Sequence, residues 1–211
     1  ISAGYAHTGP PNCLQARLCG WKLEQQNLGI NSLTVANLPI AEANTWFDAD
    51  LANNDLGVCV AHNNFGAAGT GLLAYEALKT KLAEAKAAHP TRKILVVLAA
   101  PKATNATTED AAYETERAAF NSAVVADAGF TNGTYADKVV DYRSDPRVGL
   151  SSSPLGATND YIMTSDRIHW KPAGAEAVAD WALPQLESLL SRATAPAAVR
   201  SYSRPNLWRA R

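Results

Sequence analysis

Short apolar runs alternate along the chain with longer stretches whose apolar residues recur at helical spacing. The apolar runs predict strands at 32–36, 56–61, 93–100 and 138–142. The helical spacing predicts helices at 42–53, 72–88, 108–128 and 172–190. Strands separated by helices are typical of βαβ crossovers, so the pattern predicts an α/β protein with one doubly wound parallel sheet.

The expected helices at 72–88 and 172–190 each carry an apolar stripe. In the first helix the stripe consists of Leu72, Leu73, Leu78, Leu82 and Ala85. In the second helix the stripe consists of Val178, Ala182, Leu186 and Leu189. We expect both stripes to pack against the rest of the protein. Pro172 suits the first turn of its helix, where the missing N–H of proline costs nothing.

Composition narrows the class of protein. The chain has 211 residues, of which 47% are hydrophobic, enough for one domain with a core, which we place at 1–190. Charged residues make up 18% and the net charge is -1, so no overall field favours nucleic acid or a membrane surface. No run approaches the ~20 apolar residues of a membrane span. Residues 191–211 contain arginines and no acid, which predicts a basic extended tail, more typical of a solvated or partner-docking arm than of nucleic-acid binding.

The cysteines and sequons bear on where the protein works. Cys13 and Cys19 are close enough in sequence to pair, whereas Cys59 lies in an apolar run and resembles a small buried hydrophobe. Glycosylation sequons begin at Asn105 and Asn132, although such triplets also arise by chance. Together these features favour a secreted, extracellular protein.

The sequence shows no pattern for a metal or a cofactor. The three cysteines lack metal-site spacing, and the histidines form no H-x₃-H pair. No glycine-rich phosphate loop follows an expected strand, so a nucleotide-binding flavodoxin-like protein is unsupported. We therefore expect neither a metal ion nor a cofactor.

The strongest candidate for chemistry is Asp166, three residues before His169, with Trp170 and Gly174 behind them. A carboxylate at this spacing can contact the imidazole, fix one tautomer and stabilise the imidazolium. Alone, the D-x-x-H pattern also arises by chance or as a helix cap. Here the pair follows the last expected strand, where ligands bind in open parallel sheets, which favours a functional role.

Two further segments follow expected strands. Asn64 comes after the strand at 56–61, and its amide could donate to a developing oxyanion; a turn-forming asparagine is the equal alternative. Glu42 ends a turn whose backbone N–H could be a second donor, although a plain strand-to-helix connection explains that segment better. The serine-rich loop 151–156 is a candidate for lining a pocket or for simple exposure to solvent.

The order of these elements resembles the SGNH (GDSL-type) hydrolases, whose fold is a flavodoxin-like α/β/α sandwich and which cleave esters. Residues 166–174 resemble the family's D-x-x-H block, its glycine and its closing helix. The resemblance implies that His169 is the general base and Asp166 its orienting carboxylate. Residues 62–65 resemble the G-x-N-D block and would make Asn64 an oxyanion donor, although His62 and Phe65 replace the glycine and the aspartate. In the second block Glu42 stands where the family has glycine, so only its backbone N–H can donate.

The family's nucleophilic G-D-S block has no counterpart. Residues 1–5 resemble the stretch that follows the serine, which implies that the nucleophile and the first strand lie upstream. The first strand of such a sheet lies between two others, so its absence would leave two unpaired inner edges. We therefore expect an upstream peptide or a neighbouring chain to fill that slot. Ser2 is the alternative nucleophile, although its hydroxyl should point away from His169.

Two functions follow from the resemblance. The first is a serine ester hydrolase, or the larger fragment of one, acting on a small-molecule or glycan ester; the family's breadth favours deacetylation of carbohydrate. The second is a catalytically inactive binding or structural domain, for example in a secreted or virion-surface assembly. The missing G-D-S, the altered blocks and the arginine-rich tail favour the second.

Overall fold

A computed structural model describes residues 56–60 and 65–189 of the chain. The elements are β1 (Leu56–Val60), α3 (Thr70–Ala88), β2 (Lys93–Val97), α4 (Ala111–Ala126), the 3₁₀ helix η2 (Ala128–Phe130), β3 (Lys138–Val140) and α5 (Pro172–Leu189). Their order matches the predicted alternation of strands and helices. The predicted strand at 32–36, the helix at 42–53 and the tail at 191–211 lie outside the described residues.

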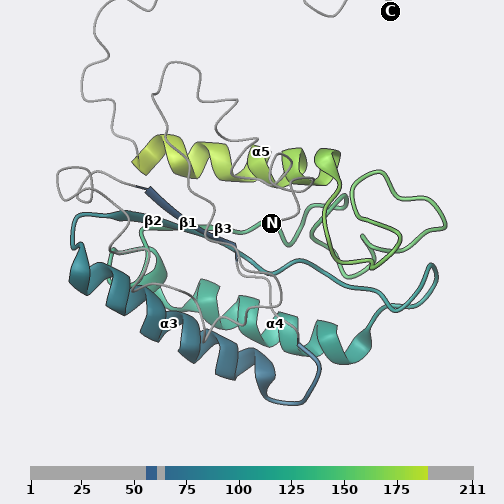
Figure 1. The fold of residues 1–211 in the computed structure, drawn as a ribbon, viewed down its shortest axis with the longest axis horizontal. Coiled ribbons are helices and arrows are strands. Elements are labelled where there is room, and N and C mark those ends of the chain that lie inside the picture. The colour runs from purple at the N-terminus through teal and green to yellow at the C-terminus, as the bar shows by residue number, and fades with distance from the viewer. Residues whose placement is uncertain (1–55, 61–64, 190–211) are drawn as a thin grey trace, which may run out of the picture.

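The three described strands form one parallel sheet in the order β1-β2-β3. Val58 of β1 pairs with Leu95 of β2, and Val97 of β2 pairs with Val140 of β3. Helix α5 covers one face of this sheet, and α3 and α4 lie on the other (Figure 1). The prediction of an α/β protein with a parallel sheet is therefore confirmed.

The core lies between the sheet and the helices on each side of it. Strand β2 is its centre, because Leu95, Val96 and Val97 are fully buried. On α5 the predicted stripe is right: Val178, Ala182 and Leu186 are buried, and Leu189 packs against the core at its edge. Phenylalanines and tyrosines from the other side complete the core, among them Phe65, Tyr113, Phe120 and Phe130.

The predicted stripe of α3 is correct at one end of the helix and wrong at the other. Leu78, Leu82 and Ala85 are buried, but Leu72 is 54% and Leu73 71% exposed. Gly71 faces α4 instead, and a Cβ on it would lie 2.1 Å from the carbonyl oxygen of Glu116. The helices approach so closely there that only a residue without a side chain fits, and the leucines beside it point to solvent.

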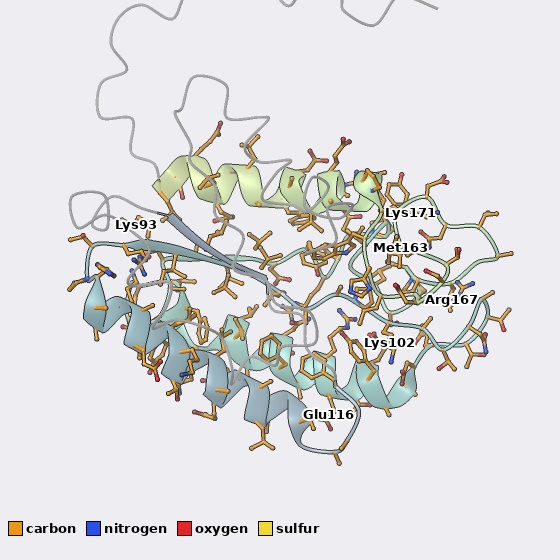
Figure 2. All side chains as sticks on the ribbon, viewed as in Figure 1. Lys93, Lys102, Glu116, Met163, Arg167 and Lys171 are labelled. Atoms are coloured by element: carbon orange, nitrogen blue, oxygen red, sulfur yellow. The ribbon has the colours of Figure 1, made fainter. Side chains whose placement is uncertain are left out.

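Glu116 of α4 also caps the start of α3. Its carboxylate oxygens accept hydrogen bonds from the backbone N–H of Gly69 at 2.9 Å and of Gly71 at 2.8 Å. Figure 2 shows Glu116 beside the first turn of α3. A negative charge at this position also complements the helix dipole, so a residue 45 positions later along the chain supplies the N-terminal cap of α3.

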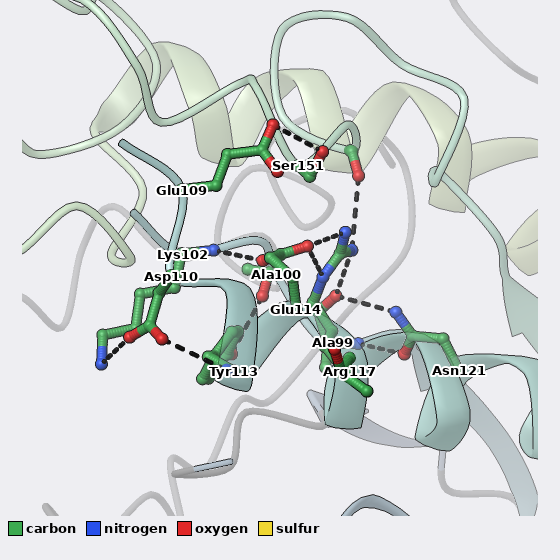
Figure 3. A network of polar contacts seen from close by, with 12 residues as sticks. Ala99, Ala100, Lys102, Glu109, Asp110, Tyr113, Glu114, Arg117, Asn121 and Ser151 are labelled. Carbon is green, nitrogen blue, oxygen red and sulfur yellow. Dashed lines mark hydrogen bonds and ion pairs between the residues drawn. The ribbon is translucent and has the colours of Figure 1, made fainter. Parts of the chain in front are cut away.

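Strand β2 ends three residues earlier than the apolar run predicts, at Val97 rather than Ala100. Along residues 98–100, side chains take the place of a neighbouring strand as hydrogen-bond partners of the backbone. The Tyr142 hydroxyl donates to the Leu98 carbonyl (2.9 Å), the Asn121 amide pairs with the Ala99 backbone, and the Tyr113 hydroxyl donates to the Ala100 carbonyl (2.9 Å). Figure 3 shows the side chains from α4 in this arrangement. The Leu98 N–H still donates to the Val140 carbonyl at 3.4 Å, but the other bonds named here come from side chains, so this buried segment lies beyond the strand.

A buried ion pair continues this network toward the loops. Arg117 donates from Nε and Nη2 to one oxygen of Glu114, at 2.8 and 2.5 Å, and from Nη1 to the Gly149 carbonyl at 3.3 Å. The other Glu114 oxygen accepts the Lys102 backbone N–H at 2.8 Å. Both charges are therefore partnered, and the pair joins α4 to the segment after β2 and to the loop after β3 (Figure 3).

Other predicted boundaries also shift by two or three residues: α3 begins at Thr70 rather than at 72, and α4 ends at Ala126 rather than at 128. Strand β3 ends at Val140 rather than Tyr142, and α4 begins at Ala111, with Asp110 accepting a hydrogen bond from the Tyr113 N–H as its N-cap. Within 56–60 and 65–189, no helix is long and apolar enough to cross a membrane.

Candidate active site

The segment before α5 forms a turn closed by backbone hydrogen bonds. Ile162 and Trp170 form an antiparallel bridge, and the Met163 N–H donates to the His169 carbonyl at 2.8 Å. The residues between them make the turn that carries Asp166 and His169. Pro172 then opens α5, as its position predicted. The Ile162–Trp170 bridge and the start of α5 therefore hold this turn in place.

Asp166 uses its two carboxylate oxygens for different partners. Oδ1 accepts the backbone N–H groups of Ile168 and His169, both at 3.1 Å, and so closes the turn. Oδ2 lies 2.9 Å from His169 Nδ1. The aspartate thus both shapes the turn and contacts the imidazole.

These contacts set the ionisation of Asp166. Partial burial acts to raise the pKa of this carboxyl, but the hydrogen bonds from the His169 backbone and ring and from the Ile168 N–H outweigh it. The pKa of Asp166 therefore lies below its usual value. A carboxylate that stays ionised beside Nδ1 favours the tautomer with the proton on Nδ1, which leaves Nε2 as the basic nitrogen.

The pair is open to solvent. The His169 side chain is 62% exposed and that of Asp166 39%. The two charges, when His169 is protonated, are therefore screened by water and hold each other only weakly.

Arg167, between the two, holds the turn to the neighbouring loops. Its φ of 55° lies in the left-handed region, and no other non-glycine residue within 56–60 and 65–189 adopts a positive φ. Its Nη1 donates to the carbonyls of Pro154 (2.9 Å) and Gly156 (3.0 Å). Its backbone carbonyl accepts the Ala103 N–H at 3.3 Å. A strained residue at a candidate site is a recognised sign of functional constraint.

Asn159 and Lys171 support the turn from behind. Asn159 Oδ1 accepts the N–H groups of Tyr161 (2.9 Å) and Ile162 (2.7 Å). The Lys171 ammonium donates to the Asn159 carbonyl, and its backbone N–H donates to the Tyr161 carbonyl at 2.8 Å. Figure 2 shows Lys102, Met163, Arg167 and Lys171 gathered at the end of the molecule opposite Lys93.

Gly174 lets α5 begin against this segment. A Cβ on Gly174 would lie 2.1 Å from the Tyr161 carbonyl oxygen and 3.2 Å from the Trp170 side chain. The glycine noted in the sequence behind the D-x-x-H is therefore a packing requirement. Trp170 packs edge-on against the buried Tyr142, with ring centroids 5.9 Å apart. This contact ties the residue after His169 to the core.

Of the predicted site residues, the structure brings together Asp166 and His169. Asn64, Glu42 and Ser2 lie outside the described residues. Sequence reasoning missed Arg167 and Asn159. No local pattern marks an arginine for the left-handed region, whereas Asn159 bonds the N–H groups two and three residues ahead, a local turn pattern typical of asparagine that could have marked it. Within the described ranges, no three His, Cys, Asp or Glu side chains are grouped so as to hold a metal ion.

An open cleft of about 550 Å³ lies beside α4, bordered by the loop after β3. Its walls include Glu109, Ser122, Arg143 and Ser151, but neither Asp166 nor His169. Ser151 Oγ donates to Glu109 Oε1 at 2.9 Å (Figure 3). The serine-rich loop thus lines a pocket, as one of its two interpretations predicted, and this pocket does not contain the Asp166–His169 pair.

Comparison with known proteins gives this chain no relatives: it matches no protein-family model, no curated protein and no solved structure. The chemistry of the site is therefore inferred from the geometry of the turn that carries Asp166 and His169.

Proposed function

We propose that this protein is a serine ester hydrolase of the SGNH type, with Asp166 and His169 as two members of its catalytic triad. The observation that carries the proposal is the 2.9 Å contact between Asp166 Oδ2 and His169 Nδ1. The contact stands at the start of the helix that follows the last described strand. Ligands of open parallel sheets bind at this end of the strands.

The roles follow from the orientation of the imidazole. His169, bound to Asp166 through Nδ1, accepts the proton of a serine hydroxyl at Nε2 while the serine oxygen attacks the ester carbonyl. The protonated imidazole then donates to the departing alkoxide, which leaves as an alcohol. Water hydrolyses the acyl-serine by the same proton transfers in reverse order, and the products are the carboxylic acid and the free enzyme.

Other components of the proposal rest on the sequence. Asn64 and the Glu42 backbone N–H would stabilise the oxyanion. The attacking serine would come from a peptide preceding residue 1, from a neighbouring chain, or from Ser2. The sheet would be part of a flavodoxin-like three-layer sandwich; helices on both of its faces support this arrangement (Figure 1). The substrate class we favour is an acetylated carbohydrate, in an extracellular setting.

Labelling with a fluorophosphonate tests the proposal, because this reagent traps an activated serine. The native protein is labelled, digested, and every labelled peptide mapped by mass. We expect one labelled serine, and we expect the label to be lost in His169→Ala. Leu73→Ala, which changes an exposed residue on α3, is the matched control and should label as the native chain does.

The alternative is an inactive binding or structural domain that kept the fold. The absence of a G-D-S from the sequence favours it. A folded protein that takes up no label, even at reagent concentrations that saturate an authentic serine hydrolase, would establish this alternative and overturn the first.

A further inference from the structure

A second surface, away from the Asp166–His169 turn, carries an exposed tryptophan. Trp181 of α5 is 38% exposed and borders an open hollow of about 510 Å³. The hollow is also lined by Asp141, Arg143 and Ser144, which follow β3. An indole combines a large apolar ring with one N–H donor, so a partly exposed tryptophan beside polar side chains can contact a ligand through both.

Trp181 is held rigidly by buried charge. Its Nε1 donates to Asp145 Oδ2 at 2.8 Å, and the Asp145 side chain is only 3% exposed. The same carboxylate binds the Arg147 guanidinium at 2.7 Å and the Arg147 backbone N–H at 2.8 Å. The polar edge of the indole is therefore fixed by the Asp145 carboxylate, and Trp181 lines the hollow from a fixed position.

The other wall of the hollow is a planar ion pair. Arg143 donates from Nε and Nη2 to the two oxygens of Asp141, at 2.8 and 2.7 Å. Both side chains are more than a third exposed, so each keeps polar atoms facing solvent. Their charges cancel, and the wall offers donors and acceptors without favouring an ion.

Arg143 also joins this hollow to the cleft beside α4. It lines both, and its Nη1 lies 3.4 Å from Ser122 Oγ, which borders the cleft. Glu109 and Ser151 continue the polar lining on the far side of that cleft. The hollow and the cleft therefore share Arg143 as a common wall. We call the two together the groove; Trp181 lines its hollow.

We propose that this groove binds a neutral oligosaccharide, with one sugar ring stacked on Trp181. Sugars combine an apolar face of C–H groups with hydroxyls at the rim. The C–H face of a sugar matches the fixed indole of Trp181. Neighbouring hydroxyls match the donors and acceptors of Asp141 and Arg143. Asp141 and Arg143 offset each other's charge, so the hollow beside Trp181 does not favour a phosphorylated or acidic ligand.

The inference does not rest on the proposed ester hydrolysis. Xylo-, cello- and chito-oligosaccharides of increasing length, all free of esters, are titrated into the full chain by calorimetry. Because these ligands hold no ester, the proposed ester hydrolysis adds nothing to the signal, and the assay tests binding independently of it. We expect at least one series to bind, with affinity that rises with chain length and is unaffected by salt.

Variants of Trp181 locate the binding. Trp181→Ala should weaken binding about tenfold or more, since an aromatic stack and its buried area are lost. Trp181→Phe keeps a ring and should retain part of the affinity, and Leu73→Ala should bind as the native chain does. Circular dichroism confirms that each variant is folded. The absence of binding by all three series, or full affinity in folded Trp181→Ala, would overturn the proposal.

Discussion

Asn121 pairs with both polar groups of the Ala99 backbone. Its Oδ1 accepts the Ala99 N–H at 3.0 Å, and its Nδ2 donates to the Ala99 carbonyl at 3.1 Å. The side chain is fully buried and reproduces the bonds that a neighbouring strand would make. One residue of α4 thus satisfies an extended segment for which the sheet supplies no partner at that position.

Replacing Asn121 by leucine should destabilise the protein by about 2–4 kcal/mol, because two buried backbone groups lose their partners together. Urea unfolding followed by circular dichroism measures the change in the free energy of unfolding. Ser122→Ala, at the exposed neighbouring position, is the control and should change it by less than about 0.5 kcal/mol. Equal stability of the two variants would mean that Ala99 finds other partners.

Asp166→Asn separates the two functions of this carboxylate. The amide oxygen can still accept the Ile168 and His169 N–H groups, so the turn should form. The amide nitrogen cannot accept a proton from Nδ1, so the imidazole should adopt the other tautomer. We expect ester hydrolysis to fall by about 10³–10⁴-fold with little change in KM. Hydrolysis of an aryl ester at saturating substrate provides the measurement, and unchanged kcat would exclude Asp166 as the orienting group.

Arg167 should be replaced by both alanine and glycine. Each variant loses the bonds to the Pro154 and Gly156 carbonyls, but only alanine keeps a Cβ at a φ of 55°. Arg167→Gly should therefore be more stable than Arg167→Ala by about 1 kcal/mol. Thermal unfolding of the pair tests this order. The reverse order would show that the left-handed backbone relaxes when the guanidinium is removed.

Gly174→Ala tests the approach of α5 to the turn. Alanine favours a helix, yet its Cβ would meet the Tyr161 carbonyl oxygen at 2.1 Å. We expect a net loss of about 1–3 kcal/mol in stability. Gly66→Ala, where a Cβ meets nothing within 4 Å, is the matched control and should be neutral or slightly stabilising. Chemical denaturation of both variants measures the two changes in the free energy of unfolding.

Asp145 should make stability depend on pH. Burial acts to raise the pKa of this carboxyl, but hydrogen bonds from Arg147 and Trp181 outweigh it and lower the pKa to about 2. Because the pKa in the unfolded chain is higher, about 3.9, the stabilisation is complete above that pH and is lost as pH falls through about 2. It amounts to about 2 kcal/mol.

The measurement compares native protein with Asp145→Asn by urea unfolding over this acidic range. The native chain should lose more stability on acidification than the variant, which has no carboxyl to protonate at this position. Parallel curves would mean that Asp145 keeps its ordinary pKa in the folded state.

The sequence predicted the elements better than their ends. The run from Ile94 to Ala100 is apolar throughout, and all of its residues are buried. The ladder nevertheless stops at Val97, because Tyr113, Asn121 and Tyr142 bind the backbone beyond it. An apolar sequence predicts that a segment is buried. It does not predict whether the backbone of that segment bonds to a neighbouring strand or to side chains of a helix.

Local sequence patterns were limited in the same way at the Asp166–His169 turn. The spacing of Asp166 and His169 predicted their contact, since a turn of four residues is a local structure. The contribution of Arg167 depends on carbonyls more than ten residues earlier, which no local pattern reveals. The prediction that Leu72 and Leu73 are buried was wrong for a related reason. The close approach of α4 to Gly71 decides which face of α3 is buried.

The cap that Glu116 provides for α3 has a consequence for the order of folding. The N–H groups of Gly69 and Gly71 gain their acceptor only when α4 has formed and docked, across 45 to 47 residues of chain. Closing so long a loop carries an entropic cost that a local cap would avoid. The bonds from Gly69 and Gly71 therefore form only once α4 has docked, which couples the first turn of α3 to α4.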